Sequence, residues 1–167
     1  MEVNVNNRIV IAALTFSAAG LVGLAVDEGY SEKAYPDPTY GAKVPTIGFG
    51  TTEGVKMGDT TTPVHALQRK LEYLQRGEQR IKTCVHVPLH QAEYDLYTNL
   101  YYNIGPANFC GSTLVKKLNE PDYRAACDQI LVWKYSNRFD CSTPGNKVCR
   151  GLWDRRLKLH QQCVAAQ

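Results

Sequence analysis

The longest apolar run of the chain lies near its N-terminus. Residues 9–26, IVIAALTFSAAGLVGLAV, contain no charged side chain; Arg8 precedes them, and Asp27 and Glu28 follow. As a helix, this run would span roughly 27 Å at about 1.5 Å per residue, just short of a hydrocarbon core of roughly 30 Å. Because glycine, serine, threonine and alanine dilute its larger apolar residues, the run is expected to hold a membrane only weakly.

Three interpretations of this run stay open on its own residues. It can be a cleaved signal peptide with a small-residue site at Ser17, Ala18 and Ala19, although the charged region before it is poor. It can be a buried helix of a cytosolic protein. It can also be an uncleaved export signal that holds the chain in the membrane, and Arg8 fits an N-terminus left in the cytoplasm.

The hydrophobic pattern then changes from β to helical. Residues 27–63 are rich in Gly, Pro, Thr and Tyr, and KVPTIGFGTTEG predicts a small twisted hairpin or meander. Gly48 and Gly50 do not indicate a phosphate-binding loop, because their spacing is wrong and no Gly-Lys-Ser/Thr follows. From Pro63 onward, apolar residues recur every three or four positions, as they do in amphipathic helices.

Two apolar stripes and two capping residues predict the helices. The stripes are Val64, Leu67, Leu71 and Leu74, and then Leu89, Ala92, Leu96, Leu100 and Ile104. Ser112 is expected to cap a short helix, Asp122 a helix that contains Ile130, Leu131 and Trp133, and a last helix covers 152–164. We therefore predict an α+β fold, with a small β-containing lobe over 27–63, a larger helical lobe over 64–167 and a cleft between them.

Charge and cysteine content limit the possible partners of the protein and its cellular compartment. The net charge of +3 is uneven, since residues 1–63 carry −3 and residues 64–167 carry +6. A basic C-terminal part favours an anionic polymer, a membrane surface or a cell wall, although a solvated face with no partner fits as well. Six cysteines, an even number, fit three disulfides and an oxidising compartment. Our working pairing is Cys141–Cys149 across a short loop, Cys110–Cys127 and Cys84–Cys163.

Two acids early in the chain suggest glycosidase chemistry. Cleaving an acetal between two sugars needs a proton donor and a second carboxylate, as nucleophile or as base for a water. Glu28 follows the apolar run, a setting that favours the protonated donor, whereas Asp37 lies in the wetter loop YPDPTY. Thr46 carries a hydroxyl that can orient the water. Two acids nine residues apart are a weak signal by themselves, and a surface acid with a loop acid explains them too.

The surrounding residues make the signal specific. DEGYSEKAYPD followed by TIGFGTT resembles the active-site region of phage-type lysozymes, glycoside hydrolase family 24. The positions that match in order are Glu28, Gly29, Asp37, Thr46, Ile47, Gly48 and Gly50. Asn103, Gly105, Ser112, Thr113 and Leu114 continue the resemblance, and Trp133 with GLWDRR echoes the C-terminal segment.

The resemblance implies a lysozyme-like fold and a muramidase activity. Glu28 would be the general acid, Asp37 the base and Thr46 the residue that holds the water, with inversion at the anomeric carbon. One departure is a three-residue insertion, because Thr46 lies nine residues after Asp37 where the family usually has six. A longer hairpin turn absorbs the insertion, but it leaves Thr39 as a competitor of Thr46.

The resemblance also selects among the interpretations of the N-terminal run. Endolysins of this family with an uncleaved weak membrane helix are called signal-arrest-release enzymes, and this chain looks like one. Residues 1–26 would then be the membrane segment and 27–167 the lysozyme domain. Leaving the bilayer would let the helix pack onto the body and position Glu28. No cysteine precedes Cys84, so we expect no anchor thiol and three structural disulfides.

Several residues keep alternative interpretations. Arg155 and Arg156 can pair with an active-site acid but are more often solvated, Glu32 can rival Glu28, and Tyr101 and Tyr102 can line a sugar site or the core. Cys84, His86 and His90 lack further metal ligands at standard spacing.

The predicted protein is a phage endolysin that is exported, tethered to the host inner membrane and released to the periplasm. It acts as a monomer on peptidoglycan, with no cofactor, metal or nucleic acid. The alternatives are a non-catalytic wall-binding module and a zinc-dependent amidase.

Overall fold

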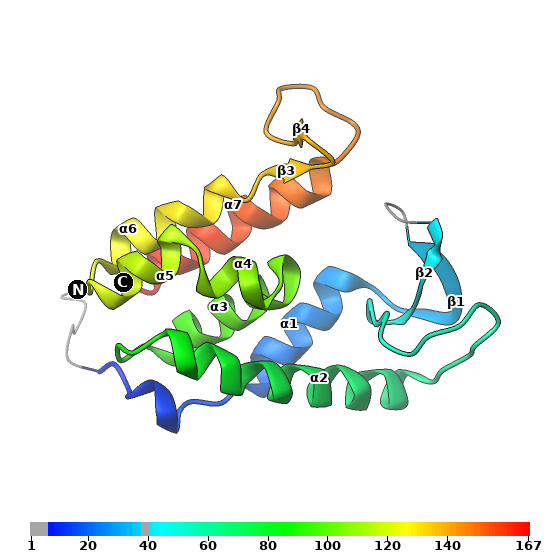
Figure 1. Cartoon of the computed structure of the whole chain (residues 1–167), viewed down its shortest axis with the longest axis horizontal. Coiled ribbons are helices and arrows are strands. Elements are labelled where there is room, and N and C mark those ends of the chain that lie inside the picture. The colour runs from blue at the N-terminus through cyan, green and yellow to red at the C-terminus, as the bar shows by residue number, and fades with distance from the viewer. Residues whose placement is uncertain (1–6, 38–40) are drawn as a thin grey trace. The chain divides into compact units, whose positions relative to one another are not determined.

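The computed structural model describes residues 7–37 and 41–167 and shows an α+β protein, as the pattern predicts (Figure 1). Its main elements in chain order are α1 (Ala18–Glu28), β1 (Ser31–Asp37), β2 (Gly41–Gly48), α2 (Pro63–Cys84), α3 (Gln91–Ile104), α4 (Pro106–Cys110), α5 (Thr113–Asn119), α6 (Tyr123–Asp128), β3 (Tyr135–Ser136), β4 (Phe139–Asp140) and α7 (Arg150–Ala165). Short 3-10 turns cover Ile11–Ala13 and Gln129–Val132.

The chain forms two compact units. Ser17–Arg76 make one, and the described residues up to Phe16 join Gly77–Gln167 in the other. We call them the hairpin unit and the helical unit. Their boundary falls within α2, a helix predicted only as part of the helical lobe.

The hairpin unit contains the predicted twisted hairpin. β1 and β2 pair antiparallel, with Tyr35 opposite Thr46. A further bridge joins Lys33 to Thr60, so the loop that follows β2 returns along β1. The unit is completed by α1 and by the first part of α2.

The helical unit has one continuous hydrophobic core. Buried side chains of α3, α4, α5, α7 and the 3-10 turn after α6 meet there, among them Tyr94, Tyr97, Leu100, Phe109, Leu114, Leu118, Ile130 and Leu159. Two predicted caps are confirmed, since the Ser112 hydroxyl accepts from Val115 N at 3.2 Å and the Asp122 carboxylate accepts from Ala125 N at 3.2 Å. The helix that Asp122 caps is shorter than predicted. It ends at Asp128, and Ile130 and Leu131 lie in the following 3-10 turn.

The N-terminal apolar run is not one helix in this structure. Only its second part, from Ala18, belongs to α1; before it, Ile9 pairs with Leu89 as an isolated β-bridge. Ile11 and Leu14 are buried in the core of the helical unit. Packing in the helical unit therefore uses Ile11 and Leu14 from an irregular part of the run. Among the described residues, no helix combines the length and apolar composition that a membrane crossing requires.

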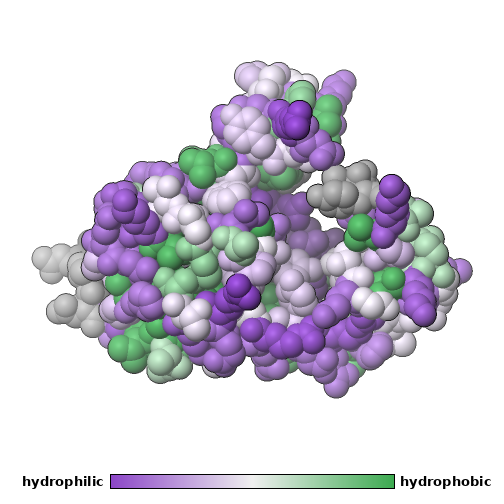
Figure 2. All heavy atoms as spheres, in the orientation of Figure 1, coloured by the Kyte–Doolittle hydropathy of each residue, from purple (hydrophilic) through white to green (hydrophobic). Residues whose placement is uncertain are grey.

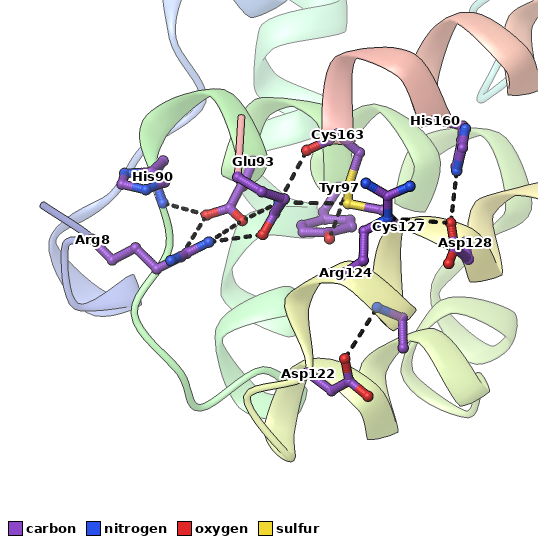
Figure 3. Close-up of a disulfide and its surroundings, with 12 residues drawn as sticks. Arg8, His90, Glu93, Tyr97, Asp122, Arg124, Cys127, Asp128, His160 and Cys163 are labelled. Atoms are coloured by element: carbon purple, nitrogen blue, oxygen red, sulfur yellow. Dashed lines mark hydrogen bonds and ion pairs between the residues drawn. A yellow bond between two sulfur atoms is a disulfide. The ribbon is translucent and has the colours of Figure 1, made fainter. Parts of the chain in front are cut away.

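Two carboxylates hold this segment in the helical unit. Arg8 Nη2 lies 3.0 Å from Glu93 Oε1, and both side chains are almost wholly buried (Figure 3). Glu93 also accepts from His90 N and from Gln167 Nε2. Farther along, Glu78 accepts the Phe16 N–H at 2.6 Å and the Tyr94 hydroxyl at 2.8 Å. Residues 8–16 are thus fixed at both ends by buried acids.

Three disulfides lie in the helical unit, as the even cysteine count predicts. Cys141–Cys149 is confirmed, but the other two predicted pairs are wrong, because the bonds are Cys84–Cys110 and Cys127–Cys163. The first joins the end of α2 to the end of α4, and the second joins α6 to α7 (Figure 3). The third closes the loop after β4. Hydrophilic side chains dominate the surface around β3 and β4 (Figure 2), where Lys134 and Asp140 form an ion pair at 2.8 Å.

Candidate active site

Glu28 is the last residue of α1. The helix begins at the Ser17 cap, whose hydroxyl accepts from Gly20 N at 3.0 Å, and it is stopped by Gly29, which has φ of 70°. That left-handed conformation favours glycine and turns the chain sharply into β1. Glu28 is therefore held at a fixed helix end, half-buried, rather than on a mobile loop.

The Glu28 carboxylate lies against the turn that follows β2. This turn is closed by two hydrogen bonds of 2.9 Å between the backbones of Ile47 and Thr51. Gly50 in the turn has φ of +73°, and a Cβ built on it would lie 2.7 Å from Glu28 Oε2. Glycine is needed at this position both for its conformation and for the space that the carboxylate occupies. The segment TIGFG is thus in contact with the predicted acid.

Asp37 is the last residue of β1 and pairs with Gly41. The preceding pair is Pro36 with Pro45, so one step along β1 corresponds to four along β2. Three additional residues on β2 therefore lie in a bulge. Thr39 lies outside the described residues.

Thr46 is 5% exposed, and its hydroxyl donates to Val44 O at 3.4 Å. Thr46 lies opposite Tyr35 on the neighbouring strand, and Tyr35 lies two residues before Asp37. The pKa of Tyr35 is raised by burial and then by the charges of Glu28 and Asp37. One phenol therefore senses both predicted carboxylates, so Glu28, Asp37 and Thr46 belong to the same neighbourhood of the hairpin unit.

Lys70 is a member of this neighbourhood that the sequence analysis missed. It lies on α2 and is 1% exposed, and its pKa is lowered to about 8 by burial, against the opposing influence of Glu28. The predicted stripe on α2 is partly wrong, because Val64 is 75% exposed. The buried face contains Ala66, Lys70, Leu74, Glu78 and Ile81. Their spacing of three to four residues was a usable signal, but two charged members hid it from a search for apolar residues.

Tyr101, Arg156 and Glu32, three further candidates from the sequence, lie in different environments. Tyr101 is buried in the core and packs edge-on against Phe109, as the core interpretation predicts. Arg156 is not solvated: it is 4% exposed, its Nε donates to Trp133 O at 3.0 Å, and burial lowers its pKa to about 10. Glu32 is exposed on β1. Within 7–37 and 41–167, no three His, Cys, Asp or Glu side chains cluster closely enough to hold a metal.

Comparisons with known proteins identify relatives of the whole chain. Residues 25–158 match the family model described as phage lysozyme. The chain is 37% identical over 130 residues to the endolysin of Salmonella phage P22, and the matched region covers 75% of this chain and 87% of the relative. It is also 37% identical over 154 residues to a SAR-endolysin of Pseudomonas phage phiKMV, which covers 92% and 89%.

A solved structure extends the likeness to the fold. The crystal structure of a P22 lysozyme mutant superposes with a TM-score of 0.74 at 34% identity, over 90% of this chain and 99% of that chain. The lysozyme-like α+β fold predicted from the sequence is therefore confirmed.

Proposed function

The chain belongs to the phage lysozyme family and is a lysozyme-type glycoside hydrolase, and from this premise we propose that it is an exported muramidase with Glu28 as its acid. Its reaction is hydrolysis of the β-1,4 bond between N-acetylmuramic acid and N-acetylglucosamine in peptidoglycan. The consequence is lysis of the bacteriophage host.

Each of three side chains has one role in this proposal. Glu28 gives its proton to the glycosidic oxygen as the bond to the anomeric carbon breaks. Asp37 takes a proton from the water that attacks this carbon, and Thr46 holds the water through its hydroxyl. The family resemblance implies inversion.

The contact of the Glu28 carboxylate with Gly50 is the observation that carries the proposal. It brings the end of α1 to the TIGFG segment. Further support is the electrostatic influence of both carboxylates on Tyr35, the cross-strand neighbour of Thr46.

The test is release of new reducing ends from purified peptidoglycan. We expect activity in the wild type, indifferent to chelator, and a loss of 10²-fold or more, on the order that general acid catalysis supplies, in Glu28→Gln and Asp37→Asn. Glu32→Gln is the matched control, because Glu32 is an exposed acid on β1.

Three results would contradict this proposal. Equal activity of the wild type and Glu28→Gln would remove Glu28 from the mechanism. Binding to peptidoglycan without new reducing ends would indicate a wall-binding module. Release of peptide that stops with chelator would indicate an amidase.

We also propose that residues 9–26 tether the newly exported chain to the inner membrane, and that release activates it. The tethered segment cannot make the contacts seen here, since Arg8 would be separated from Glu93 and Phe16 N from Glu78. Glu28 would be held at the bilayer boundary. Leaving the membrane forms these contacts together and completes the helix end from which Glu28 projects.

The tether is tested by making the run more apolar where the released fold has room. Ala19 and Gly23 are both exposed, and a Cβ on Gly23 meets no atom within 4 Å. The double variant Ala19→Leu, Gly23→Leu should stay in the membrane fraction and delay lysis, whereas Ala19→Ser, Gly23→Ser should appear early in the periplasm. Equal release of both variants would contradict the tether.

A further inference from the structure

A buried ammonium group is the most unusual charge in the hairpin unit. Lys70 is 1% exposed, although a lysine side chain ordinarily keeps its charged end in water. Burial lowers the pKa of Lys70 to about 8, and the charge of Glu28 counteracts that effect. Since burying a charge is unfavourable unless it is paired, the charge of Glu28 compensates for part of this cost.

The backbone around the turn shows why these two groups meet. A Cβ on Gly48 would lie 2.7 Å from Ala66 Cβ, so the turn packs directly on the first turns of α2. Lys70 lies one helical turn after Ala66 and therefore on the same face. Two residues beyond Gly48, Gly50 contacts the Glu28 carboxylate. The face of α2 that presents Lys70 is thus pressed against the segment that contacts Glu28.

Other titratable groups of the neighbourhood come from β1. Tyr35 senses Glu28 and Asp37, and its pKa is raised by burial and by both charges, so its phenol stays neutral. Asp37 adds a negative charge on the same strand. Lys70 adds a positive charge from α2, and Glu28 is the acid whose charge acts on it.

We propose that Lys70 is a positioning residue of the muramidase: it holds the Glu28 carboxylate in place and sets the pH at which Glu28 gives up its proton. This inference rests on the proposed function and deepens it. Lys70 acts through Glu28. At neutral pH the ammonium form of Lys70 dominates, and above about pH 8 this positive charge is lost.

The test is the pH dependence of kcat/KM in Lys70→Met, Lys70→Arg and Lys56→Met, measured on purified peptidoglycan. In Lys70→Met the high-pH limb of the pH–rate profile should move to higher pH, because a neighbouring cation no longer favours loss of the acid's proton. Lys70→Arg keeps the cation and should keep the limb near its wild-type position. Lys56 is an exposed lysine of the same unit, so Lys56→Met controls for the loss of one positive charge.

A second measurement does not depend on turnover. Carbon-13 NMR of glutamate carboxyl groups follows the titration of Glu28 directly, and its midpoint should rise in Lys70→Met relative to the wild type. If Lys70→Met does not fold, Lys70→Gln replaces it in both measurements.

The outcomes separate the two claims. An unmoved limb and an unmoved NMR midpoint, in an active wild type, would overturn the role of Lys70 and leave the muramidase proposal standing. A moved midpoint in a wild type that releases no reducing ends would support the Lys70–Glu28 coupling and overturn the activity.

Discussion

Replacing Gly50 by alanine should remove much of the activity for a reason visible in the structure. The added Cβ would lie 2.7 Å from Glu28 Oε2, and ordinary contacts begin at 3.4 Å, so the carboxylate has to move by about 0.7 Å. This oxygen is the end of a flexible side chain, and its displacement therefore has little effect on folding. Its effect on proton transfer is large, because a misplacement of about 1 Å can reduce the rate on the order of 10²-fold.

The folding effect of the same substitution comes from the backbone. Gly50 has φ of +73°, where a residue with a Cβ is less stable by about 1–2 kcal/mol. Gly54 offers a matched control, since its φ is +69° and a Cβ there meets nothing within 4 Å. Gly54→Ala should therefore lose similar stability without disturbing Glu28.

The assay combines kcat/KM for reducing-end release with urea unfolding of both variants. We expect similar losses of unfolding free energy, and a fall in kcat/KM of about 30- to 100-fold in Gly50→Ala alone. Equal kcat/KM in Gly50→Ala and Gly54→Ala would refute the argument that the position of the Glu28 carboxylate limits the reaction.

Three further predictions concern the helical unit. Arg8→Met should lower the free energy of unfolding by about 3 kcal/mol, because it leaves the buried Glu93 without its cation. Urea unfolding measures this loss, with Arg124→Met as the control because Arg124 is exposed. Equal losses in the two variants would contradict the prediction. Replacing both cysteines by alanine should lower the free energy of unfolding by about 4 kcal/mol for Cys127–Cys163 and by about 2.5 kcal/mol for Cys141–Cys149, because the loops that these bonds close span 36 and 8 residues. If urea unfolding gave the reverse order, the argument from loop length would be contradicted. Hydrogen bonds from Lys134 and Ser142 lower the pKa of Asp140 to about 2, so the ionised Asp140 stabilises the fold fully above its ordinary pKa of 3.8 and less as the pH falls toward 2. The wild type should therefore be more stable than Asp140→Asn at pH 6 and lose that advantage at pH 2. A difference in urea midpoint that does not depend on pH would contradict this prediction.

The sequence was most informative where local chemistry decides the structure. Ser112 and Asp122 cap their helices because each side chain reaches a backbone N–H three residues ahead. The hairpin over 31–48 follows from glycines and β-branched residues. These signals need no knowledge of distant parts of the chain.

The sequence was least informative where distant segments meet. Cys84 bonds to Cys110 because α2 and α4 end close together, and no spacing rule contains that fact. The run 9–26 has the apolar character of a membrane segment. Its first part instead forms a bridge and a 3-10 turn in the helical unit, and only its second part is helical, as α1 of the hairpin unit.

The candidate site shows the same division. The resemblance named Glu28, Asp37 and Thr46, but Lys70 escaped notice because a charged residue on a buried helix face breaks the apolar period. Glu28, the acid whose charge acts on Lys70, lies 42 positions earlier in the chain, so this influence becomes visible only in the folded hairpin unit.

The chemical identity of the new sugar ends tests the central claim most directly. Peptidoglycan digested by the wild type or by Glu28→Gln is reduced with borohydride, and the fragments are analysed by mass spectrometry. The account predicts reduced N-acetylmuramic acid ends from the wild type and almost none from Glu28→Gln. Reduced N-acetylglucosamine ends, or equal amounts of product from the two proteins, would contradict it.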